Sequence, residues 1–141
     1  SEPRRLPAVP ISVLMINGSE DTLVRNEGGA VGTKRHPRGT SIPVADAVRF
    51  WVEANGCATS PRSLDEIDRD PNDGTRVRKN EYTGGRQGAA VVFYEIEGGG
   101  HTWSGGVQYM PELLVGKTSR DLNACQTIWD FFKQHPRASQ P

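Results

Sequence analysis

Two short apolar runs mark the start and the last third of the chain as buried strands. Residues 11–17 read ISVLMIN and residues 89–96 read AAVVFYEI, and glycine or polar residues follow each run. A nearly continuous apolar run of this length is typical of a strand covered on both faces, as in a parallel sheet enclosed by helices. The pattern therefore predicts an α/β sheet that contains both runs.

A first helix is predicted over residues 43–55. Pro43 suits a first helical turn, and Asn55 followed by Gly56 supplies a stop signal. The apolar side chains recur at helical spacing on one face: Val44, Val48, Trp51 and Val52. This helix should cover one face of the sheet.

A second amphipathic helix is predicted near the end of the chain, before Pro136. Thr118 and Asp121 have the spacing of a capping box, which predicts that the helix begins there. Its apolar face comprises Leu122, Cys125, Ile128, Trp129 and Phe132.

The remaining segments divide the chain. Residues 1–10 are predicted to be a linker, and 11–56 hold the first strand, a polar loop, a polar flexible segment (30–40) and the first helix. Residues 57–88 form an excursion, irregular to 75 and then a weakly alternating strand (76–83) that turns at Gly84 and Gly85 into a β-hairpin. Residues 89–141 hold the last strand, a glycine-rich loop and the final helix. This order predicts the back part of an α/β sheet within one partial domain.

Composition narrows the function classes. The 141 residues include 17 basic and 17 acidic residues, so no basic field indicates nucleic acid or an anionic membrane as a partner. No apolar run approaches the roughly 18 residues of a membrane span. Cys57 and Cys125 make neither a disulfide framework nor a zinc motif, and no metal or cofactor is expected.

Candidate chemistry lies after the two apolar strands. Three glycines follow the last strand and present His101 on a loop, where an imidazole can transfer protons near neutral pH. Asp21 lies in the loop after the first strand, and parallel strands would bring both loops to one edge of the sheet. An aspartate there can hold the imidazole in one tautomer. Glu20 is the neighbouring alternative. A surface histidine and a turn-capping aspartate are the non-functional interpretations.

The stretches that carry these residues resemble one known family. They read ISVLMINGSEDTLV, FWVEANGC, VVFYEIEGGGHTWSGG and LVGKTSRDLNACQTIWDFFKQHPR. Together and in this order they resemble the polyhydroxybutyrate depolymerase-like and feruloyl esterase-like branch of the α/β-hydrolases. The resemblance implies the carboxyl-terminal part of that fold, with Asp21 as the acid and His101 as the general base of a triad. It also implies Trp103 at the mouth of the site, an ester substrate, and a secreted or periplasmic protein.

One motif of that family is absent from the sequence. The nucleophilic serine of a G-x-S-x-G elbow should precede the acid, and no such motif occurs. Ser19 stands in the acid loop and Ser104 only three residues after His101, so neither is a good nucleophile. We therefore expect the chain alone to be inactive, with an N-terminal half or another chain completing the sheet. The alternative is a non-catalytic module that retains this scaffold and acts through association.

Two further motifs favour structural roles. The segment DRDPNDG (68–74) resembles a calcium loop, but Asp73 and Lys79 occupy the positions that need glycine and glutamate, so we expect a solvated turn. In the family, the residue matching Cys57 often has a disulfide partner before the last strand. No cysteine is present there, and Cys125 is a poor substitute, so two unpaired thiols are expected.

Overall fold

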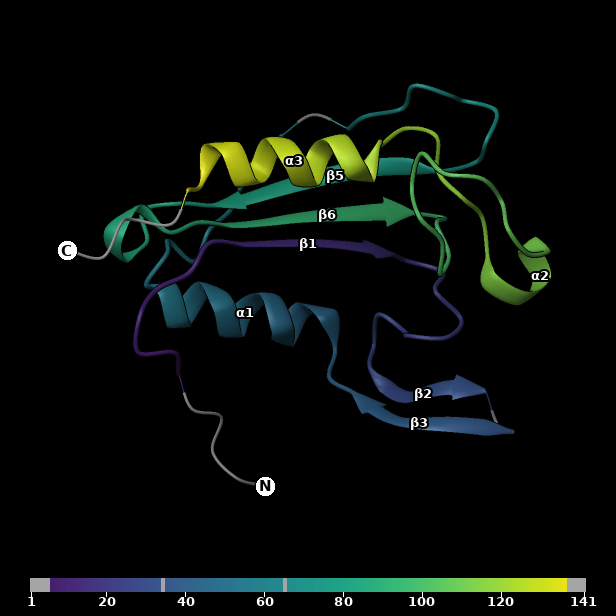
Figure 1. Ribbon diagram of the computed structural model, residues 1–141, viewed down its shortest axis with the longest axis horizontal. Helices are drawn as coiled ribbons and strands as arrows, with labels where there is room; N and C mark the ends of the chain where they lie inside the picture. The colour runs from purple at the N-terminus through teal and green to yellow at the C-terminus, as the bar shows by residue number, and fades with distance from the viewer. Residues whose placement is uncertain (1–5, 34, 65, 137–141) are drawn as a thin grey trace.

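The computed structural model describes residues 6–33, 35–64 and 66–136, and its centre is a mixed four-stranded sheet (Figure 1). The strand order is β1 (Val13–Gly18), β6 (Val91–Glu97), β5 (Arg76–Tyr82) and β4 (Arg62–Ser63). β1 and β6 run parallel, with Gly18 opposite Ile96, whereas β5 is antiparallel to both β6 and β4. The predicted parallel pair and the predicted hairpin are both confirmed.

Helices cover both faces of this sheet, α1 (Val44–Asn55) on one side and α3 (Ala124–Gln134) on the other (Figure 1). Alternate side chains of each strand point to opposite faces. The α1 core joins the buried valines of the helix to one set: Met15, Val91 and Phe93. The opposite core gathers the other set with Leu122: Ile16, Val77, Tyr94 and Ile96. These layers make the chain an α/β protein.

The predicted start of the final helix is wrong. Asn123 is the N-cap, and its side chain accepts a hydrogen bond from Gln126 N at 3.0 Å. The Thr118 Oγ1 atom is buried and has no hydrogen-bond partner among the described residues, and the Asp121 carboxylate binds another loop. Residues 116–122 are not helical, because this segment lies against the glycine-rich loop, where the carbonyl oxygens of Lys117 and Ser119 accept hydrogen bonds from Gly100 N and Gly105 N.

The segment predicted to be flexible forms a two-stranded antiparallel hairpin, β2 (Gly29–Thr33) and β3 (His36–Ser41). Its sequence is polar and glycine-rich, so no alternating apolar pattern indicated strands. Gly32 N donates to Leu23 O at 3.0 Å, which ties the hairpin to the preceding loop. Two short elements complete the fold, a 3-10 turn η1 (Arg86–Gly88) and α2 (Glu112–Val115).

β1 lies at one edge of the sheet. It pairs with β6 on one side, and no strand among the described residues pairs with its other side. The side chains of Val13 to Asn17 are accordingly only half-buried. On the neighbouring helix α3, Trp129 and Phe132 are 62% and 61% exposed. The core that the sequence pattern predicts is therefore covered on the α1 side and open beside β1.

Candidate active site

The parallel pairing of β1 and β6 brings the two candidate loops together. Glu20 N donates to Gly99 O at 2.9 Å, so the loop after β1 lies against the glycines that follow β6. A Cβ atom on Gly18 would lie 2.3 Å from Gly99 O, so a larger residue at position 18 would push the loops apart. The prediction that both loops meet at one edge is confirmed.

Asp21 and His101 are in direct contact at this edge. The Nδ1 atom of His101 lies 2.8 Å from Oδ2 of Asp21, across 80 residues of sequence. The other carboxylate oxygen, Oδ1, accepts hydrogen bonds from Leu23 N at 2.8 Å and Val24 N at 2.7 Å. Two backbone amides therefore fix the carboxylate, and its second oxygen is free to bind the ring.

This contact selects the tautomer of the imidazole. A carboxylate only accepts hydrogen bonds, so Nδ1 of His101 carries the proton and Nε2 presents its lone pair. Nε2 has no hydrogen-bond partner in the described part of the chain. The Asp21 side chain is 8% exposed and that of His101 is 45% exposed. The pair can thus accept a proton at an accessible nitrogen and stabilise the resulting imidazolium.

The backbone of the His101 loop is held by residues 115–119, which we call the strap. His101 N donates to Val115 O at 2.6 Å, and Gly100 N donates to Lys117 O at 2.9 Å. A Cβ atom on Gly100 would lie 2.0 Å from Val115 O, so the two backbones touch. The sequence does not predict this support, because nothing in the residue pattern of the strap indicates a contact with the loop.

A pocket of about 420 Å³ opens beside the pair. Trp103 is 55% exposed in its wall, and Tyr109, which also lines the pocket, donates its hydroxyl proton to His101 O at 2.8 Å. The Trp103 Nε1 group also donates to Cys125 Sγ at 3.3 Å, which steadies the indole. Trp103 therefore lies in the wall of the pocket beside His101.

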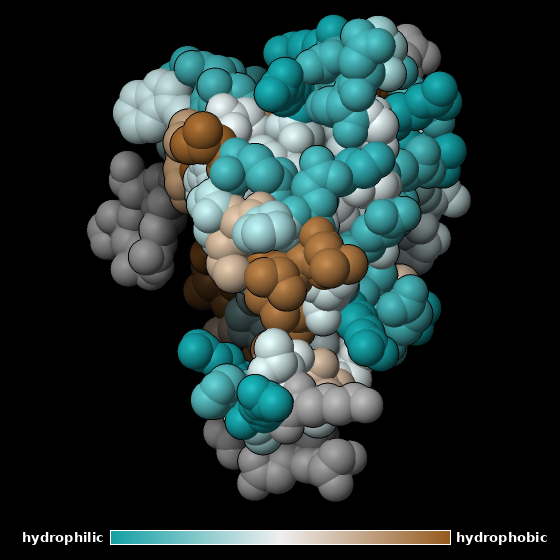
Figure 2. Space-filling view, turned by 90° about the vertical axis from the view of Figure 1, so that its right-hand side faces the viewer, coloured by the Kyte–Doolittle hydropathy of each residue, from teal (hydrophilic) through white to brown (hydrophobic). Residues whose placement is uncertain are grey.

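The segment that follows Trp103 carries several exposed apolar side chains. Figure 2 faces the edge at which β1 and β6 end, and apolar side chains gather near the middle of this face. The segment between Trp103 and the strap contributes exposed side chains, namely Val107, Met110, Leu113 and Leu114. One contact anchors this segment to the acid loop, because Thr22 Oγ1 donates to Leu114 O at 2.9 Å.

The other candidate side chains do not join the pair. Glu20 is exposed and makes no hydrogen bond to His101 in the described part of the chain, so Asp21 is the acid that the structure brings to the ring. Ser19 Oγ accepts from Gly98 N at 2.9 Å. Ser104 is buried and lines a separate pocket of about 210 Å³ with Leu14. Neither serine hydrogen-bonds to the histidine.

The two cysteines form no disulfide, and the described residues contain no metal-binding cluster. Both cysteines are free; burial raises the pKa of the Cys57 thiol, and Cys125 is exposed. Within residues 6–33, 35–64 and 66–136, no group of three or more His, Cys, Asp or Glu side chains could hold a metal ion. No helix of this described part is long and apolar enough to cross a membrane.

Fold and geometry together define an α/β protein with an aspartate–histidine pair at the carboxyl edge of two parallel strands. Comparison with known proteins found a protein of similar sequence that is described as an esterase. The chain is 31% identical over 133 residues to a protein described as "Putative esterase NocK" from Nocardia uniformis subsp. tsuyamanensis. The alignment covers 89% of this chain and 38% of that protein, so the chain spans well under half of its relative. No family model and no solved structure matches the chain.

Proposed function

We propose that this chain is the carboxyl-terminal part of a serine carboxylesterase and supplies the acid and base of its catalytic triad. The observation that carries the proposal is the 2.8 Å contact between His101 Nδ1 and Asp21 Oδ2, in a chain similar to an esterase. An ordered carboxylate, a half-exposed ring and a free Nε2 are the features that a general base needs.

The proposed reaction is acyl transfer to a serine outside these residues. Nε2 of His101 takes the serine proton as the oxygen attacks the ester carbonyl, and then gives that proton to the departing alkoxide. In the second half-reaction the same nitrogen takes a proton from the water that attacks the acyl-serine, and it returns this proton to the serine oxygen as the acid is released. Asp21 stabilises the imidazolium in both steps, and the chemistry requires no cofactor.

The proposed substrates are carboxylic esters with an apolar portion. The exposed Trp103 indole and the Tyr109 ring support this choice, because both line the pocket beside His101 and offer it an aromatic contact surface. The sequence resemblance suggests polyhydroxyalkanoate oligomers or phenolic esters, and secretion or a periplasmic location. Trp103 is the proposed substrate contact.

The direct test is His101→Ala in a polypeptide that also contains the nucleophile. Hydrolysis of p-nitrophenyl butyrate should lose about three or more orders of magnitude in kcat, because the general base is removed. His36→Ala is the matched control, since His36 is exposed on β3. Near-normal hydrolysis by His101→Ala would refute the assignment.

The 141-residue chain alone should give no turnover of the same ester. A serine-directed phosphonate tests this directly, because it labels an activated serine. Turnover that the phosphonate blocks would reveal a nucleophile within this sequence and would contradict the proposed division of the triad.

A second candidate function is a non-catalytic module that acts through association. The open side of β1 and the exposed Trp129 and Phe132 favour it, because an unpaired strand beside apolar side chains is a template for another chain. Sedimentation of the chain would test this. A stable assembly, together with no labelling of any longer form by the phosphonate, would favour the module over the esterase.

A further inference from the structure

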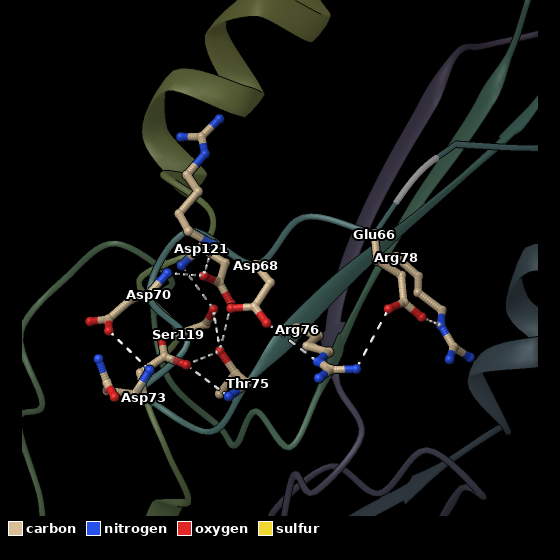
Figure 3. A network of polar contacts seen from close by, with 11 residues as sticks. Glu66, Asp68, Asp70, Asp73, Thr75, Arg76, Arg78, Ser119 and Asp121 are labelled. Carbon is tan, nitrogen blue, oxygen red and sulfur yellow. Dashed lines mark hydrogen bonds and ion pairs between the residues drawn. The ribbon is translucent and has the colours of Figure 1, made fainter.

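We infer that a buried polar clamp, formed by Thr75, Ser119 and Asp121, positions the loop that carries His101. The importance of that position for catalysis rests on the proposed function. Figure 3 shows Thr75, just before β5, meeting Ser119 and Asp121 from the segment before α3. All three are at most 3% exposed, so water does not compete for their hydrogen bonds.

Asp121 joins the clamp to the loop before β5. Its Oδ1 atom accepts hydrogen bonds from Arg69 N at 2.6 Å and Asp70 N at 2.8 Å. Its own amide donates to Ser119 Oγ at 3.2 Å. A fully buried carboxylate without its hydrogen bonds would be strongly unfavourable, so this arrangement fixes the two segments relative to each other.

Thr75 lies at the centre of the clamp. Its Oγ1 atom is 2.7 Å from Asp73 Oδ1, 2.7 Å from Ser119 Oγ and 3.1 Å from Asp121 Oδ2. A hydroxyl has one proton to donate, so it serves one carboxylate at a time and accepts from Ser119. The hydroxyl thus lies within hydrogen-bonding distance of two carboxylates, each of which also accepts from backbone amides.

The clamp reaches His101 through the strap. Ser119 O accepts a hydrogen bond from Gly105 N at 2.8 Å, just beyond the histidine. Lys117 O accepts from Gly100 N and from Thr102 Oγ1, both at 2.9 Å. The residues on each side of His101 are therefore bound to the segment that the clamp anchors.

A second contact connects the same two regions. A Cβ atom on Gly98 would lie 2.6 Å from Gly74 O, so the start of the histidine loop rests on the loop that Asp121 holds. His101 is half-exposed, and Asp21 holds its ring at Nδ1. The ring can meet Asp21 only if the loop backbone is in place, and the clamp anchors the segment to which that backbone is bound.

The test separates positioning from simple stabilisation of the fold. Thr75→Val removes the central hydroxyl and keeps the side-chain shape, whereas Thr75→Ser keeps the hydroxyl. Val48→Ala destabilises the α1 core on the opposite face and serves as the control for lost stability. The readout is NMR of the 141-residue chain, well below each unfolding temperature.

Two signals should respond to the clamp. The Hδ1 proton of His101, hydrogen-bonded to Asp21, should give a downfield resonance in the wild type and in Thr75→Ser. It should disappear in Thr75→Val, and amide exchange at Gly100 and Gly105 should accelerate by about tenfold or more. Val48→Ala should leave the downfield resonance in place and the exchange ratio of these amides to that of Met15 unchanged.

Several results would overturn the inference. If Thr75→Val keeps the resonance and the slow exchange, the clamp does not position the loop. If Val48→Ala changes both signals equally, the clamp acts only through global stability. If Thr75→Val does not fold, Ser119→Ala provides the milder test, and unchanged exchange at Gly105 would then refute the inference.

A different result would contradict the proposed function. A wild-type chain without the downfield resonance would contradict the Asp21–His101 pair. The exchange rates at Gly100 and Gly105 would still decide whether the clamp holds the loop. The two failures are therefore distinguishable in one set of spectra.

Discussion

Asp21 and Asp121 make the same local pattern of hydrogen bonds but have different roles. In each, Oδ1 accepts hydrogen bonds from two consecutive backbone amides, and Oδ2 is directed at one further side chain. For Asp21 that side chain is the half-exposed imidazole of His101. For Asp121 it is the buried hydroxyl of Thr75.

The difference lies in what the second oxygen binds. An imidazole titrates near neutral pH and leaves Nε2 accessible, so an ordered carboxylate beside it can support proton transfer. A buried hydroxyl does not titrate, so the same hydrogen-bond pattern beside Thr75 can only fix geometry. Two aspartates with similar hydrogen-bond patterns should therefore respond in opposite ways to substitution, one in activity and the other in stability.

The largest expected effect follows from Asp21→Asn in a form of the protein that contains the nucleophile. The amide oxygen can still accept from the Leu23 and Val24 amides, but the NH₂ group then faces the ring. It would favour the tautomer with its proton on Nε2, which cannot act as a base. We expect kcat for p-nitrophenyl butyrate to fall by about 10³–10⁴-fold.

The control for this change is its unfolding curve. Urea denaturation of Asp21→Asn should change the free energy of unfolding by about 1 kcal/mol or less, because the amide hydrogen bonds are retained. A large loss of stability with unchanged kcat would show that Asp21 acts as Asp121 does, and the contrast between the two would disappear.

Asp121→Ala should give the next largest effect, this time on stability. The substitution leaves the Arg69 and Asp70 amides without their buried acceptor and removes one of the contacts of the Thr75 hydroxyl. We expect a loss of about 2–5 kcal/mol in the free energy of unfolding, measured by urea denaturation. Asp130→Ala on the exposed face of α3 is the control and should change little. Equal effects of the two substitutions would contradict a special role for the clamp.

The smallest effect concerns pH. Partial burial acts to raise the pKa of Asp73, but hydrogen bonds from Arg120 N and from Thr75 outweigh it and hold the pKa below 3.8. A lowered folded pKa means that Asp73 stabilises the fold above the ordinary aspartate pKa. That contribution should be lost as the pH falls through the lower folded value.

Asp73→Asn should weaken this dependence. The free energy of unfolding, followed from about pH 5 to pH 2.5, should fall less steeply in the variant than in the wild type. Identical slopes would mean that the carboxylate of Asp73 contributes nothing to the edge of the clamp.

The sequence predicted the elements whose apolar pattern is strong. The strands at 11–17 and 89–96 and the first helix appear within two residues of their predicted bounds. The hairpin at 29–41 escaped prediction because its strands bury little, and backbone hydrogen bonds hold it. The capping box was misread because Asp121 had a stronger alternative: two amides and a hydroxyl from a loop about 50 residues away.

The candidate site also has a part that the sequence predicts and a part that it does not. Asp21 and His101 could be predicted to meet, since parallel strands end at a common edge. The strap and the clamp could not, because their contacts to the loop are mostly carbonyl oxygens and glycine surfaces that carry no residue-type signal. Sequence pattern thus predicts which reactive side chains meet, and long-range backbone contacts decide how firmly they are held.

The backbone contacts at Gly18 and Gly100 have a consequence for engineering. There the acid loop, the histidine loop and the strap touch backbone to backbone, with no side chain between them. Their spacing is set by peptide dimensions, which do not vary, rather than by the shapes of interchangeable apolar residues. A redesigned or randomly mutated core could therefore change in volume while the Asp21–His101 distance stays nearly constant. These three backbone segments could therefore be grafted together into another scaffold with their mutual spacing retained.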